Sequence, residues 1–253
     1  MISLDASSVL LQWSTGGLFF LWLTARHRLV GLGYHWLVHG IYAVLALLAF
    51  LIGARFDWVP LRDLAALAVS VIAFALLAVS FVRRRREGVQ VYDLRLELLA
   101  PAVGVVGLVA AGANAGDPTW LSIARMLVGA AFLGVVFDAM LLGHWYLVQP
   151  GLSRAPLLEL TRWTGALWLP EVVLLLVPTG MVSVWTGVID DGYAGMLGWF
   201  WGACVVTTIG LVVATLAALR EQEYSAVMAA TGLLYLSILT GFGIDLVARA
   251  SLA

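Results

Sequence analysis

Apolar residues fill the chain in eight long runs, which short polar segments separate. A helix that spans a bilayer needs about 20 predominantly apolar residues. The pattern therefore predicts eight spanning helices, over residues 7–25, 30–54, 64–82, 96–113, 121–148, 164–188, 194–219 and 225–248. The segments between them carry Pro, Gly, Asn and Asp, which are typical of loops. We predict an all-α polytopic bundle that forms one integral membrane domain, residues 1–253.

The composition supports this fold and narrows the function. Hydrophobic residues make up 62% of the chain and charged residues 11%, whereas a soluble domain has about a quarter charged. The lipid bilayer is therefore the first expected partner. A net charge of −1 gives no reason to expect nucleic acid as a partner. The single Cys204 excludes an internal disulfide and a multi-cysteine metal site.

Arginine placement predicts the orientation. If the N-terminus lies outside, ten arginines fall at inside ends and four at outside ends, as the positive-inside rule requires. The four outside ones are Arg55, Arg62, Arg125 and Arg249. Both termini are then outside, and we expect a multi-pass protein of a bacterial-type inner membrane. The run from Arg83 to Arg86 is expected to act as a topology determinant beside anionic lipid, or else to dock a soluble partner.

Three of the four histidines fall within predicted spans. His35 and His39 are four residues apart, so they share a helix face. At about 1.5 Å per residue from the inside ends, His144 lies roughly 6 Å deep, His35 roughly 8 Å and His39 roughly 15 Å. Ionisable groups are costly to bury in a membrane and are functional-site candidates for that reason.

Two acids are predicted near the same depth. By the same count, Glu171 lies about 11 Å and Asp138 about 15 Å from the inside. Pro170 and Pro178 interrupt the span that carries Glu171, so we expect this helix to line a cavity. Residues 151–163 before it are expected to form a short amphipathic turn in the interface.

One hypothesis for these residues is a haem b site. Such a haem needs one histidine from each of two helices at similar depth. His35 or His39 together with His144 would meet that requirement. A non-haem metal is a second hypothesis, with His35 and His39 binding one ion and His144, Asp138 or Glu171 completing the set.

A quinone or proton site is a third hypothesis. His144, Trp145, Tyr146 and Gln149 could bind a quinone carbonyl, while Asp138 and Glu171 handle protons or orient an imidazole. The same protonatable groups would also serve a proton-coupled transporter. The remaining interpretation is structural, in which the histidines only bond across helices.

Our leading expectation is a redox-type membrane subunit with a haem or quinol site in the inner half of the bilayer. A chain with so little soluble mass would need other membrane or peripheral subunits to form an oxidoreductase complex. The alternatives are a proton-coupled transporter and a structural or assembly subunit. Gly198 and Gly202 form a GxxxG pattern that would suit either packing within the chain or a homo-oligomer.

Overall fold

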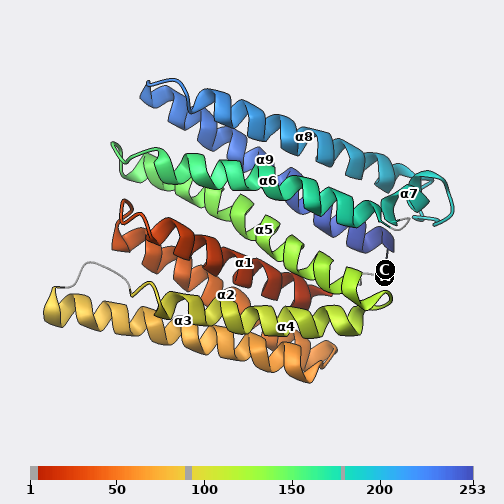
Figure 1. Ribbon diagram of the computed structural model, residues 1–253, viewed down its shortest axis with the longest axis horizontal. Coiled ribbons are helices and arrows are strands. Elements are labelled where there is room, and N and C mark those ends of the chain that lie inside the picture. Colours follow the sequence, from red (N-terminus) through yellow and green to blue (C-terminus); the bar gives the residue numbers. More distant parts are fainter. Residues whose placement is uncertain (1–4, 89–92, 178–179, 253) are drawn as a thin grey trace.

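Figure 1 shows the computed structural model, an all-α bundle in which residues 5–88, 93–177 and 180–252 are described. The elements are α1 (Ala6–Ala25), α2 (Leu32–Phe56), α3 (Pro60–Glu87), η1 (Leu96–Leu98), α4 (Leu99–Ala115), α5 (Thr119–Val148), α6 (Ala155–Leu176), α7 (Gly180–Trp185), α8 (Met196–Ala218) and α9 (Tyr224–Leu252). The described residues contain no strand, so the predicted fold class is confirmed.

The long helices form two groups of four. In the first group α1 contacts α2, α2 contacts α3, α3 contacts α4, and α4 returns to α1. The second group repeats this circuit with α5, α6, α8 and α9. The groups meet mainly where α1 packs against α5 and α4 against α5 (Figure 1). Side chains of both helix groups therefore meet along the junction of α1 and α4 with α5.

Successive long helices alternate in direction, so both ends of the described chain lie at one end of the bundle, as predicted (Figure 1). We call this the outer end. The opposite end, with the loop between α1 and α2 and the arginines of α3, is the inner end. The histidine-bearing helices α2 and α5 hold different places in their groups, so the similarity of their His-Trp stretches does not reflect equivalent helices.

Six helices in the described part are long and apolar enough to cross a membrane: α2, α3, η1 with α4, α5, α8 and α9. The chain is thus a multi-pass membrane protein. The count of eight was approximate, because α1 and α6 are more polar. Helix α1 buries Ser7, Ser8, Gln12, Ser14, Thr15 and Thr24 at the centre of the bundle. A helix shielded by its neighbours needs less apolar surface than one facing lipid.

The sixth predicted span was wrong in its bounds. A helix covers Ala155–Leu176, so most of the expected interfacial turn at 151–163 is helical. Pro170 lies inside this helix without ending it, and Pro178 lies outside the described residues. Arg125 stabilises the helix end, since its Nε donates to Leu174 O at 2.8 Å and its Nη2 to Val177 O at 2.6 Å. A cation suits the negative end of a helix dipole.

These new bounds move Glu171. It lies sixteen residues after Ala155, which is about 24 Å from the inner end at 1.5 Å per residue. Glu171 therefore belongs to the outer half of the bundle. Our expectation that it shares the inner half with the histidines was wrong, because the helix begins nine residues earlier than its apolar run suggested.

Gly198 and Gly202 both face Trp185 of the same chain. A Cβ atom on Gly198 would lie 2.8 Å from Trp185 Cδ1, and one on Gly202 would lie 3.1 Å from Trp185 Cζ2. Because these two glycines have no side chain, the indole ring of Trp185 in α7 packs directly against the backbone of α8. Association with a second copy through them is untested.

Asp191 holds the start of α8. Its Oδ1 accepts the N–H groups of Tyr193 at 2.9 Å and Gly195 at 2.8 Å, and its Oδ2 accepts that of Leu197 at 2.9 Å. Desolvation raises the pKa of this carboxyl. Hydrogen bonds from the N–H groups of Gly195, Tyr193 and Leu197 lower it by more, so the pKa of Asp191 is below its usual range.

A lowered pKa in the folded state means that the ionised carboxylate stabilises this turn above the unfolded pKa of about 4, and that the effect is lost as the pH falls through the folded pKa. Asp191→Ala should speed hydrogen exchange of the Gly195 and Leu197 amides about fivefold at neutral pH, after correction for intrinsic rates. Asp190→Ala is the control, because among the described residues Asp190 accepts a single hydrogen bond, from the Gly192 N–H. Equal effects of the two changes would contradict the prediction.

Candidate functional site

His35 and His39 lie on one face of α2 near the inner end, as their spacing predicted. Both are buried, with 3% and 1% of their surface exposed. Glu97 of η1 faces them, and its Oε2 lies 3.2 Å from Nδ1 of His39. The carboxylate is itself 4% exposed. Two imidazoles and one carboxylate therefore meet in the interior of the first helix group.

The surroundings of the two imidazoles differ. The ring of His35 packs edge-on against that of Tyr34, with 5.8 Å between the ring centroids. Both ring nitrogens of His39 are buried without a hydrogen bond, because the approach to Glu97 has the distance of an ion pair but not the alignment of a hydrogen bond. A buried polar group without a hydrogen-bond partner is costly, so the burial of the His39 imidazole lowers the stability of the fold.

Asp138 lies about two thirds of the way along α5, ten residues before its last residue, and is fully buried. Its Oδ1 accepts a hydrogen bond from the hydroxyl of Tyr42, and its backbone oxygen accepts one from Tyr34 at 3.4 Å. Oδ2 has no hydrogen-bond partner. Among the described residues, no arginine or histidine forms an ion pair with Asp138. This carboxyl joins α5 of the second group to α2 of the first.

The third buried set lies in the outer half, between α1, α5, α6 and α9. Arg249 donates to Asp245 Oδ2 at 2.7 Å and to Gln12 Oε1 at 2.6 Å. Gln12 in turn donates to Met126 O at 2.8 Å. Gly129 leaves room for this set, because a Cβ there would lie 2.8 Å from Gln12 Nε2, 3.3 Å from Asp245 Oδ1 and 3.7 Å from Glu171 Oε1.

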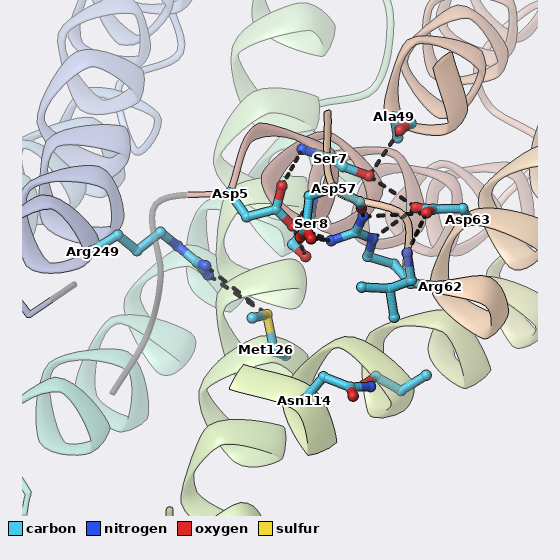
Figure 2. A network of polar contacts seen from close by, with 12 residues as sticks. Asp5, Ser7, Ser8, Ala49, Asp57, Arg62, Asp63, Asn114, Met126 and Arg249 are labelled. Atoms are coloured by element: carbon cyan, nitrogen blue, oxygen red, sulfur yellow. Dashed lines mark hydrogen bonds and ion pairs between the residues drawn. The ribbon is translucent and has the colours of Figure 1, made fainter. Parts of the chain in front are cut away.

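Four ionisable groups lie near one another in this outer set. They are the carboxyls of Asp245 and Glu171 and the guanidinium groups of Arg249 and Arg125. Figure 2 shows Arg249 extended toward Met126, whose sulfur lies 3.9 Å from Nη2. The Asp245–Arg249 pairing at four residues apart, expected from the sequence, is thus one part of a larger buried network.

Figure 2 also shows a separate ionic network around Arg62, at the outer end of α1 and α3. Arg62 is 2% exposed, and it donates to Asp63 Oδ1 at 2.7 Å and to Asp5 Oδ2 at 2.5 Å. Ser7 links this network to α2, because its hydroxyl donates to Ala49 O at 2.8 Å. All these contacts tie helix ends together, so we assign this network to folding.

His144 does not join the other histidines. It is exposed on α5, and its Nδ1 lies 3.0 Å from the hydroxyl of Tyr235 on α9. The neighbouring candidates fix the loop after α5. Trp145 Nε1 donates to Gln149 Oε1 at 3.2 Å, and Tyr146 donates its hydroxyl to Ser153 O. His144 thus faces α9, Trp145 and Gln149 bond to each other, and Tyr146 binds the following loop.

The residues expected to share one inner site thus occupy four places. His35 and His39 stay together, Asp138 lies deeper with two tyrosines, His144 is exposed beside Tyr235, and Glu171 lies in the outer half. Within the described ranges, no three His, Cys, Asp or Glu side chains are grouped so that they could hold one metal ion. Haem b and quinol binding stay predictions of the sequence alone.

Glu97 was missed by sequence reasoning, as were Tyr34, Tyr42 and Gln12. Glu97 stands at the start of an apolar run, a position typical of a residue at headgroup level. The sequence therefore offers no sign that the structure would bury it against His39. Tyr34 and Tyr42 could have been found from their spacing, because eight residues place them on one face of α2, beside the histidines.

The fold and these sites define the class: a polytopic helical membrane protein with ionisable side chains buried at three depths. Comparisons with protein-family models, with curated proteins and with solved structures found no match. The function must therefore be argued from the geometry alone.

Proposed function

We propose that the protein is a proton-coupled transporter of a bacterial-type inner membrane, in which Asp138 binds and releases the coupling proton. One observation carries the proposal: a fully buried carboxyl about 15 Å from the inner end of α5, with one oxygen bound by Tyr42 and the other without a hydrogen-bond partner. This depth is about half the thickness of a hydrocarbon core. Intramembrane acids with this placement are typical of proton pathways.

The position of Asp138 between the two helix groups supports transport over a purely structural role. In transporters built from repeated halves, the coupling-ion site lies near the bilayer midplane where the halves meet. Asp138 belongs to α5 of one group and is bonded by tyrosines of α2 in the other. A small shift between the groups would change which side of the membrane reaches the carboxyl.

Protonatable groups on either side of Asp138 give the proton a route. Toward the inner end lie His35, His39 and Glu97, of which His39 has ring nitrogens free of hydrogen bonds. Toward the outer end lie Glu171 and Asp245, of which Asp245 forms an ion pair with Arg249. An ionised Asp138 would have no counter-charge among the described residues, and burying an unpaired charge is very costly. Proton release must therefore accompany opening of the site to water.

Replacing Asp138 by asparagine tests the proposal. Proteoliposomes that contain a pH-sensitive dye would be given an inside-negative potential and a panel of small organic acids, amines and sugars. We expect proton uptake with at least one compound class, and uptake roughly 100-fold slower in Asp138→Asn, because an amide of the same shape cannot carry the proton.

Asp117→Asn is the matched control, since Asp117 lies in the exposed loop between α4 and α5. It should transport like the unchanged protein. Tyr42→Phe, which removes the hydroxyl bonded to Asp138, should slow uptake without abolishing it. Proton uptake no faster than in protein-free liposomes with every compound, or normal uptake by Asp138→Asn, would overturn the proposal.

A further inference from the structure

A polar pocket of about 450 Å³ opens at the inner end of the first helix group. It lies between the loop that joins α1 to α2 and the last turns of α3. Residues 28–33, Trp36, Arg84 and Gln149 line it. Its volume falls within the range of about 300–1,000 Å³ that is usual for small-molecule sites. The proton sites described above do not use this pocket.

The charged groups among the described residues of the pocket all have one sign. Of these lining residues, Arg28 and Arg84 are the two charged ones, and none is a carboxylate. Gln149 Oε1 already accepts a hydrogen bond from Trp145, so the other polar end of its amide is an N–H donor. A pocket with two guanidinium groups and no acid is complementary to an anion, and the fork of arginine N–H groups fits phosphate oxygens.

The start of α2 adds to the same preference. Gly31, its N-cap, lies on the pocket wall and supplies no side-chain hydrogen bond, and the first turn has no acidic residue. The first N–H groups of this 25-residue helix are therefore free of side-chain caps. Both these N–H groups and the helix dipole favour an anion here.

We propose that this pocket binds a phosphate group, either the phosphodiester of an anionic lipid of the inner leaflet or a soluble phosphate. Leu29, Leu32 and Trp36 form an apolar wall beside the two arginines, next to which a lipid glycerol and its esters would lie. The proposal is independent of proton transfer, because neither Asp138 nor the buried histidines line the pocket.

Binding can be measured on the full-length protein in neutral detergent by calorimetry with two probes, short-chain phosphatidylglycerol and inorganic phosphate. Arg28→Gln and Arg84→Gln should each weaken binding about tenfold, because each removes a charge-assisted hydrogen bond. Arg86→Gln is the matched control, as it removes the same charge from the same exposed helix end without lining the pocket. Circular dichroism and thermal unfolding would verify that all variants fold.

The two probes distinguish the sources of the phosphate. Binding of phosphatidylglycerol alone would support a lipid headgroup site, and binding of both probes would support a site for the phosphate group itself. In either case the losses must be confined to Arg28→Gln and Arg84→Gln. Equal losses in Arg86→Gln would mean attraction to the basic surface, and this result, like failure of both probes to bind, would overturn the proposal.

Discussion

Arg249→Met is expected to lower the free energy of unfolding by about 3–5 kcal/mol, the usual cost of removing one partner from a buried ion pair. Arg249 is fully buried and binds Asp245 and Gln12 at 2.7 and 2.6 Å. Without it, the buried carboxylate of Asp245 would lose its ion-pair partner. Reversible unfolding in mixed detergent micelles, followed by circular dichroism, would measure the change.

The double variant Arg249→Met with Asp245→Leu separates loss of the pair from loss of packing. It removes both members of the buried ion pair together, so no unpaired carboxylate is left at position 245, and we expect it to regain most of the lost stability. Arg55→Gln is the control, because this exposed outer-end arginine should shift stability by no more than about 0.5 kcal/mol. An Arg249→Met variant as stable as Arg55→Gln would contradict the buried network.

Burial of arginines also explains why some of them fall at the outer end, contrary to the positive-inside rule. Four arginines fall at the outer end, and three of them, Arg62, Arg125 and Arg249, are buried in contacts with acids or carbonyls. Only Arg55 of the four is exposed. The arginine asymmetry between the two ends is therefore larger than the plain count suggested, because charges neutralised inside the protein do not face the membrane surface. The orientation itself stays a prediction.

Helix bounds were less predictable than helix number, because hydropathy detects the hydrocarbon core and not the helix. Helix α3 was predicted over 64–82 but runs from Pro60 to Glu87, through the arginine run to Gly88, whose φ is 66°. The four arginines are good helix formers, so the helix continues past the apolar run until a glycine in the left-handed region ends it. The same error at α6 displaced Glu171.

The candidate site was predicted in its residue types and only partly in its grouping. The i, i+4 spacing of His35 and His39 is a local rule, and it placed both on one buried face. Whether His144 would face α2 or α9 depends on how α5 is rotated in the bundle. Its apolar run has nearly uniform hydrophobicity around the helix, so nothing local indicates that rotation, and the structure turns His144 toward Tyr235.

The contact between α1 and α5 joins the two helix groups, and Gly134→Val is expected to disrupt it. A Cβ on Gly134 would lie 2.2 Å from the carbonyl carbon of Gly16 and 2.5 Å from the nitrogen of Gly17. These are backbone atoms, so no side-chain rotation can relieve the clash and the helices must separate. We expect a loss of at least about 3 kcal/mol, the upper end of the usual cost of overpacking.

Gly210→Ala is the matched control for this change. Gly210 lies in the interior of α8, and a Cβ there would meet nothing within 4 Å. Its replacement should raise stability by up to about 1 kcal/mol through helix propensity. Size-exclusion profiles and thermal unfolding in detergent would compare the two variants. Because Asp138 and Tyr42 face each other across the junction of the two groups, separation of α1 from α5 should also reduce proton uptake. Stability and uptake equal to those of Gly210→Ala would show that the groups do not meet at Gly134.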